Sequence, residues 1–324
     1  MQTNGGFRVK IMSIFISGSV AYDTILEADC SFCDHATTLN LKGFNLTFQA
    51  PKMKRHFGGC AANIAYSLKA CGGEPFISTA IGLIDCQPYY QHLRQAGIRV
   101  DGIITVENEY TPQAFITTDN HGNQLATFHE GAMSKADKAY VSAQEVFTHG
   151  IITSTAPHVM KAHTSLLKCR NVPVVWDVGP SAGYLSTDDI IWMLSRTDYL
   201  TVSEAEWALI LEKSKLSPKE LADQFKAIII TKAEKGCDLI LDGQTTHFDA
   251  LAVENLVNPV GCGDAFRGGL LRGLSLNLEW RQTIQLALLM GNIKAKHDAP
   301  QSYQLNKEEV AHLYECAYGE TIAL

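Results

Sequence analysis

The residues best suited to chemistry lie in a small-residue turn at 261–264, Gly-Cys-Gly-Asp, directly before an apolar helical pattern. A turn that opens a helix points backbone N–H groups at one place, and the helix dipole favours an anion there. Asp264 adds a carboxylate that can accept a proton from a hydroxyl group. An anion cradle beside a base suits transfer of a phosphoryl group to an alcohol. A simple N-terminal cap is the competing interpretation of Asp264.

Two other phosphate-binding loops are excluded. No Gly-x-x-x-x-Gly-Lys-Ser/Thr pattern occurs anywhere in the chain. Phe266 stands where a dinucleotide-binding Gly-x-Gly-x-x-Gly loop would need its third glycine. The turn therefore belongs to another class of anion site.

A second glycine turn, Gly58-Gly59, opens a helical pattern of small and apolar residues. Asn63 is the one polar residue with a forked side chain in its first turn, and Gly72-Gly73 closes the helix in the usual C-terminal manner. A core helix with tight backbone packing is the competing interpretation.

In their order and wide separation, the two segments resemble the signatures of the ribokinase-like, or pfkB-type, carbohydrate kinase family. Gly58–Asn63 is similar to its amino-terminal Gly-Gly-x-x-x-Asn signature, and Gly261–Asp264 to its carboxy-terminal Gly-x-Gly-Asp signature. The likeness covers essentially the whole chain from about Met12. Stretches 114–133 and 261–267 look most similar to bacterial adenosine-kinase-like members.

The resemblance implies an ATP-dependent kinase in which Asp264 is the general base for the acceptor hydroxyl. Backbone N–H groups of Gly261, Cys262 and Gly263 would hold the charge that develops on the transferred phosphoryl group. The Cys262 thiol is interpreted as a space-filler rather than a nucleophile. Arg267 stands one helical turn beyond Asp264, where it reaches the phosphates or forms a surface salt bridge.

The acceptor side is assigned in the same way. Asp23 follows the first strand, where open α/β sheets bind ligands, and by resemblance it binds sugar hydroxyls; a turn-forming aspartate is the alternative. Gly58, Gly59 and Asn63 would contact the same sugar, with Asn63 offering a donor and an acceptor. An adenosine-type base needs an apolar slot, for which Phe115 is a candidate wall. Three further phenylalanines could line that slot, and any of the four could equally pack the lid against the core (Phe44, Phe48, Phe57).

The nucleotide side rests on the resemblance. Ser203 and Glu206 occupy the place of the family's Asn-x-x-Glu, so Glu206 would act on magnesium through water, while Ser203 departs from the pattern. Thr231 and Gly236 are similar to the turn that touches ATP phosphates and ribose, and Asn292 would lie near the adenine. Mg²⁺ is expected to bridge the ATP phosphates.

Asn258 stands where the family commonly has an Asp ahead of the anion turn. That Asp helps to build a monovalent-cation site in potassium-activated members, so its loss puts potassium activation in question.

Composition narrows the class of partner. The formal net charge is −7 and no Lys/Arg run occurs, so a nucleic-acid footprint is absent. No apolar run approaches the length of a membrane span, and no membrane partner is expected. Nine scattered cysteines favour a reduced, cytoplasmic protein over a disulfide scaffold. Cys30 and Cys33, with His35 nearby, have a metal-like spacing, but no second pair stands close by.

The elements that must position these residues form a regular pattern. Short apolar strands, such as 13–17, alternate with amphipathic helices, which predicts an α/β three-layer fold with a mainly parallel sheet and helices on both faces. Segments 39–57 and 105–128 show alternating strand patterns and turns. By resemblance, segments of about 24–57 and 105–130 form a small β-sheet lid over the substrate. We expect a single domain over 12–324, with 1–11 as a leader or extension of unknown role.

Three functions stay open. The first is phosphorylation of the primary hydroxyl of an adenosine-type nucleoside to its 5′-monophosphate. The second is a kinase of the same fold that acts on ribose or another sugar. The third is a catalytically silent ligand-binding relative, which Ser203 and Asn258 favour and the intact Asp264 opposes. The partner is a small-molecule nucleoside or sugar, and a homodimer is left open because family members pair through lid strands or remain single.

Overall fold

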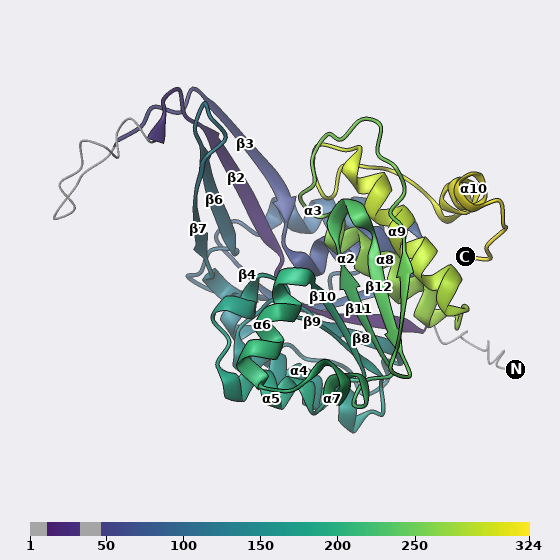
Figure 1. Ribbon diagram of the computed structural model, residues 1–324. Coiled ribbons are helices and arrows are strands. Elements are labelled where there is room, and N and C mark those ends of the chain that lie inside the picture. The colour runs from purple at the N-terminus through teal and green to yellow at the C-terminus, as the bar shows by residue number, and fades with distance from the viewer. Residues whose placement is uncertain (1–11, 33–46) are drawn as a thin grey trace, which may run out of the picture.

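The computed structural model describes residues 12–32 and 47–324, and within them the chain forms one large and one small sheet (Figure 1). Helices cover both faces of the large sheet, and the small sheet projects from one side of it. The predicted α/β class is confirmed. The expectations for Cys33, His35 and Phe44 lie outside the described residues.

The large sheet counts nine strands over the described residues. From edge to edge it runs β13 (Gln244–Phe248), β12 (Cys237–Leu241), β11 (Ala227–Thr231), β10 (Tyr199–Ser203), β9 (Val174–Asp177), β8 (Phe147–Ile152), β1 (Ser13–Ser17), β4 (Pro75–Gly82) and β5 (Ile103–Val106). Neighbouring strands are parallel except in the pairs β11–β12 and β12–β13. The sheet is therefore mainly parallel, as predicted, with an antiparallel hairpin at one edge.

The two faces of the sheet have separate cores because successive strand residues point to opposite sides. Ile14 and Ile16 pack in one core, whereas Phe15 packs in the other. The first face is covered by α2 (Cys60–Ala70), α3 (Gln87–Gln95), α8 (Cys262–Ser275) and α9 (Trp280–Ala295), with α10 (Lys307–Tyr318) packed outside α9. The second face is covered by α4 (Pro157–Cys169), α5 (Thr187–Leu194), α6 (Glu204–Ser214) and α7 (Pro218–Ala222). Short 3₁₀ helices are η1 (Gly131–Lys138), η2 (Gly179–Gly183) and η3 (Ala233–Lys235).

The small sheet has the order β3 (Lys52–Gly58), β2 (Ala21–Glu27), β6 (Gln113–Thr118) and β7 (Gln124–His129). It differs from the expected lid segments in two ways. Strand β2 already begins at Ala21, and the chain near 105 belongs to β5, at the edge of the large sheet. A strand pattern indicates extended chain, but the sheet that a strand joins depends on neighbours that are distant in sequence.

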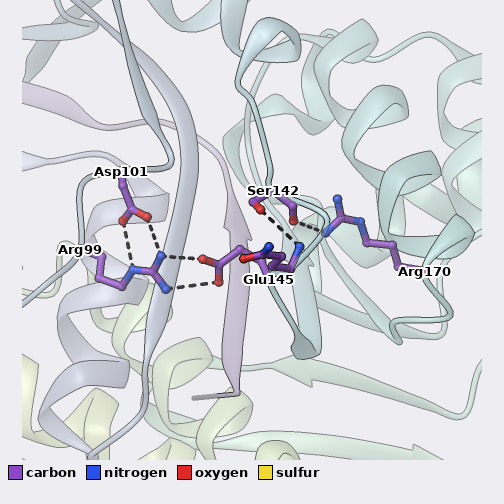
Figure 2. Close-up of polar contacts among 6 residues, drawn as sticks. Arg99, Asp101, Ser142, Glu145 and Arg170 are labelled. Atoms are coloured by element: carbon purple, nitrogen blue, oxygen red, sulfur yellow. Dashed lines mark hydrogen bonds and ion pairs between the residues drawn. The ribbon is translucent and has the colours of Figure 1, made fainter. Parts of the chain in front are cut away.

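A cluster of charged side chains joins the chain before β5 to the chain before β8 (Figure 2). The Arg99 guanidinium donates to Asp101 at 3.0 Å and to Glu145 at 2.7 Å. Arg170 donates to the carbonyl oxygen of Ser142 at 3.1 Å. These side chains are partly exposed, so each pair contributes little stability by itself. Because the Arg99 contacts join segments that precede both strands, they lie at the amino-terminal end of the parallel sheet.

None of the described helices is long and apolar enough to cross a membrane. The cytoplasmic location and the homodimer stay predictions.

Candidate active site

The Gly261–Asp264 turn opens α8, as predicted. Gly261 has a φ of 83°, in the left-handed region that favours glycine. A Cβ at this position would also lie 2.8 Å from the ring of Pro300. Both the backbone conformation and the available space therefore require glycine at the start of the turn.

The N–H groups of the turn do not all point outward. The Cys262 N–H donates to the Pro259 carbonyl oxygen at 3.2 Å and closes the turn. This corrects the expectation that Cys262 belongs to the anion hole. The N–H groups of Gly261, Gly263 and Asp264 find no acceptor among residues 12–32 and 47–324. These free donors lie at the positive end of the helix dipole, where an anion is stabilised.

The Asp264 side chain reaches across to α2 instead of capping its own helix. Helix α8 has no side-chain cap, and Asn63 Nδ2 donates to Asp264 Oδ2 at 2.8 Å. The cap interpretation is therefore wrong. The pKa of Asp264 is raised to about 7, mainly by burial; the Arg267 charge and the Asn63 hydrogen bond act to lower it, and the charges of Asp177 and Asp23 act to raise it. A carboxyl group with a near-neutral pKa suits general base catalysis.

Asn63 is buried and oriented by Gln301, which was not assigned to the acceptor side. Gln301 Nε2 donates to Asn63 Oδ1 at 2.8 Å, and Gln301 Oε1 accepts from His92 Nε2 at 2.9 Å. The Asn63 oxygen thus accepts one hydrogen bond from Gln301, and its nitrogen faces Asp264. One N–H and one lone pair of the oxygen remain for a ligand, so the expected donor and acceptor stay a prediction.

Asp23 extends from β2 beside Gly58 of β3. A Cβ on Gly58 would lie 2.1 Å from Asp23 Oδ2, so glycine leaves the space that this carboxylate occupies. Gly59, with a φ of 86°, makes the tight entry into α2, where a Cβ would lie 2.6 Å from the Ser19 carbonyl oxygen. Burial raises the pKa of Asp23 to about 6. Within the described residues no hydrogen bond or ion pair engages this carboxylate.

Phe115 lies on the opposite face of the small sheet from Asp23. In the parallel pair β2–β6, Phe115 is opposite Thr24, and Ala114 is opposite Asp23. Phe128 of β7 pairs with Ala114 and shares the Asp23 face. If Asp23 holds the acceptor, Phe115 therefore faces away from it. Phe128, which is 52% exposed, is the phenylalanine that faces the same side as Asp23.

Two other candidate phenylalanines pack against protein. Phe57 stacks on His92 with ring centroids 4.0 Å apart, and Phe48 lies 5.0 Å from the Phe32 ring. Both contacts agree with the packing alternative.

Arg267 is buried behind the turn, so the surface salt bridge is wrong. Its Nη2 lies 2.5 Å from Asp177 Oδ1, at the carboxyl end of β9. Thr153, directly after β8, donates to Asp177 Oδ2 at 2.6 Å. A Cβ on Gly263 would lie 2.7 Å from Arg267 Nη1. The guanidinium therefore lies directly behind the turn, where its charge acts on Asp177 and Asp264.

The nucleotide candidates lie along the carboxyl ends of the strands next to Asp177. Ser203 ends β10 and pairs with Thr231, which ends β11. The Ser203 N–H donates to Glu206 Oε2 at 2.7 Å, and the Glu206 N–H donates to Ser203 Oγ at 3.3 Å. Serine at 203 thus has a structural reason, because the two residues form a capping box for α6. Gly236, with a φ of 96°, closes the turn between β11 and β12.

Asn292 holds a loop of the protein. Its Nδ2 donates to the carbonyl oxygens of Leu251 and Ala252 at 3.0 and 3.1 Å. These contacts support the segment between β13 and α8, and the position of Asn292 near the adenine stays a prediction.

Comparison with known proteins decides the family. Residues 20–306 match the family described as pfkB family carbohydrate kinase. The chain belongs to the pfkB family. It is an ATP-dependent kinase that acts on a hydroxyl group.

Individual relatives of this pfkB kinase support the fold and the activity. The nucleoside kinase of Burkholderia thailandensis, solved in complex with inosine, is 32% identical, with 96% of this chain and 100% of that chain covered and a TM-score of 0.86. A nucleoside kinase of Thermoplasma acidophilum is 25% identical over 262 residues, which is 80% of this chain and 84% of the relative. The ribokinase of Thermotoga maritima, 20% identical, has a TM-score of 0.75 over 94% of this chain and 100% of that chain, and the ribokinase-like fold is confirmed.

Sequence reasoning missed three residues of the candidate site in this pfkB kinase. Asp177 ends the buried strand β9, and Thr153 directly follows the buried strand β8. A position at the carboxyl end of a strand is the signal that pointed to Asp23, and it could have found both residues. Gln301 lies outside every helix and strand, and no local pattern marks it.

Proposed function

We propose that this pfkB kinase transfers the γ-phosphoryl group of ATP to the 5′-hydroxyl of an adenosine-type nucleoside. The observation that carries the proposal is the placement of Asp264, which is hydrogen-bonded by Asn63 and lies in the same helical turn as unengaged N–H groups. The similar kinase of Burkholderia thailandensis is in complex with inosine, which favours a nucleoside over a free sugar.

The proposed reaction needs one proton transfer and one displacement. Asp264 accepts the proton of the 5′-hydroxyl while that oxygen forms its bond to the γ-phosphorus. The bond from the γ-phosphorus to the bridging oxygen of the β-phosphate breaks, and ADP leaves. The N–H groups of Gly263 and Asp264, with the Arg267 charge behind them, stabilise the charge on the transferred group.

The acceptor is held from the small sheet. The free carboxylate of Asp23 accepts hydrogen bonds from two ribose hydroxyls, and Gly58 and Gly59 let the sugar approach the backbone. The remaining Asn63 N–H completes the polar contacts. Phe128 forms one wall of the slot for the base, and the small sheet acts as the lid of a single domain over 12–324.

Magnesium fits the residues at the strand ends. Mg²⁺ would be held mostly by the nucleotide phosphates and water, because protein carboxylates rarely enclose it alone. Glu206 uses Oε2 for its capping bond, and its other carboxylate oxygen would hold the hydration shell of the ion. When bound, Mg²⁺ would supply positive charge that neutralises the phosphates. Thr231 and Gly236 contact the nucleotide phosphates and ribose in the same proposal.

The test is a coupled ATP-consumption assay with magnesium over adenosine, inosine, guanosine, cytidine, ribose and fructose. Turnover of a purine nucleoside well above the two sugars supports the proposal. Preference for ribose or fructose supports the second candidate, a sugar kinase, which the family description itself favours. Absence of turnover with every acceptor would support a silent relative. Asp223→Asn, at an exposed position on the end of α7, is a matched control for substitutions of Asp264.

A further inference from the structure

A lysine is buried without a carboxylate partner behind the anion turn. Lys294, in the last turn of α9, has 0% of its surface exposed. Its Nζ donates to the Asn258 carbonyl oxygen at 2.7 Å and to the His297 carbonyl oxygen at 3.0 Å. Burying an ammonium group is costly unless its charge is compensated. The two carbonyl dipoles therefore form a dedicated cation-binding site.

The two carbonyl groups come from the segments that frame the turn. Asn258 begins the segment that leads into Gly261, and its Nδ2 donates to the Asp298 carbonyl oxygen at 2.7 Å. Its Oδ1 accepts from the Val260 N–H at 2.9 Å. Pro300, two residues beyond Asp298, packs on Gly261. The ammonium thus links the segment at Asn258, which precedes the turn, to the segment after α9 that contains His297 and leads to Pro300.

Asparagine at 258 fits this arrangement, because an aspartate has no N–H to donate to the Asp298 carbonyl oxygen. Backbone carbonyl oxygens are the groups that coordinate potassium, and an ammonium group carries the same charge in a similar volume.

We propose that the Lys294 ammonium is a built-in monovalent cation that holds the anion turn in its working conformation, so that turnover needs no potassium. Lys294 acts here as a positioning residue: it touches neither ATP nor the acceptor. The inference rests on the proposed phosphoryl transfer at Asp264 and extends it.

The experiment compares two variants that remove the ammonium in different ways. Lys294→Ala leaves space for an ion, whereas Lys294→Met fills that space with an apolar chain. Lys296→Ala, at the exposed end of the same helix, is the control. Turnover is measured in sodium, potassium and ammonium chloride at equal ionic strength.

We expect wild type and Lys296→Ala to turn over equally in all three salts. Both Lys294 variants lose a charged hydrogen-bond donor. Their turnover in sodium chloride should therefore be at least about tenfold lower than that of wild type. Potassium or ammonium should restore most of it in Lys294→Ala and none in Lys294→Met. Strong potassium activation of wild type, or equal behaviour of the two Lys294 variants in every salt, would overturn the proposal.

A second readout separates this inference from the proposed function. Thermal unfolding without nucleotide or acceptor should show that potassium raises the Tm of Lys294→Ala but leaves wild type and Lys294→Met unchanged. This shift is expected even if no acceptor is phosphorylated, and its absence counts against the inference alone. If Lys294→Ala does not fold in sodium, recovery by refolding in potassium supports the proposal, and failure to recover contradicts it.

Discussion

Replacing Asp264 by Asn should lower activity and raise stability at the same time. The ordinary pKa of 3.8 is raised to about 7 in the folded chain, mainly by burial. A shift of about 3 units at about 1.4 kcal/mol each means that ionisation of Asp264 costs the folded state about 4 kcal/mol. Asn has nearly the same shape, carries no charge, and its oxygen can still accept from Asn63.

The gain in stability should depend on pH with a defined sign. The pKa of Asp264 is higher in the folded state than in the unfolded state, so its protonation stabilises the folded state. This contribution to the free energy of unfolding is complete below pH 3.8 and is lost as the pH rises to about 7. Wild type loses this stability between pH 3.8 and about 7, and the Asn variant does not. The Tm difference should therefore be near zero at pH 4 and reach a plateau above pH 7. For 324 residues, about 4 kcal/mol corresponds to about 6 °C.

Thermal unfolding between pH 4 and 8 measures the difference for wild type, Asp264→Asn and Asp223→Asn. The coupled assay should show kcat reduced by about 10²- to 10⁴-fold, with the KM for the acceptor changed little. A Tm difference that does not grow with pH would refute the burial argument. Normal turnover of the Asn variant would refute the role of Asp264 as base, whatever the Tm.

Three further predictions follow from the same contacts. The base has a pKa of about 7, so kcat/KM should fall about tenfold per pH unit below that value, and a profile flat from pH 5 to 8 would contradict it. Gly58→Ala should raise the KM for the acceptor at least about tenfold, because a Cβ would displace the Asp23 carboxylate and lose a charged hydrogen bond; Gly183→Ala, whose Cβ would meet open space, is the control, and equal KM values would argue against the contact. Asp177→Asn leaves Arg267 buried without its ion pair and should lower the free energy of unfolding by about 3–5 kcal/mol, measured by urea denaturation, where a loss below about 1 kcal/mol would show that the pair is replaceable.

Local patterns predicted the elements and the glycine turn before α8, because both depend on residues that are close together in the sequence. The capping box at Ser217 and Glu220, the strand at 13–17 and the glycine turn at 261 need only neighbours in sequence. Phe115 shows the limit. Strand alternation places it on one face and Asp23 on the other, but the face that meets the substrate depends on how the small sheet sits against α2 and α8.

Long-range contacts explain the remaining differences. Asp177 belongs to the site because β9 pairs with β8 and β10, and this pairing joins segments that are distant in sequence. Gln301 acts through Asn63, which is 238 positions away in sequence. Lys294 resembles an ordinary surface lysine near a helix end, and only packing shows that it is buried.

The close approach of Arg267 to Gly263 restricts the order in which residues of the site can be substituted during evolution. A side chain at 263 would meet a guanidinium that its ion pair with Asp177 holds in place, so that substitution is damaging while Arg267 is present. A shorter residue at 267 would remove the obstacle, but on its own it would leave the Asp177 carboxylate buried and unpaired. The three positions are therefore coupled, and their separate effects should not add. A lineage could exchange this arrangement only through an intermediate of lower fitness or through a change elsewhere that came first.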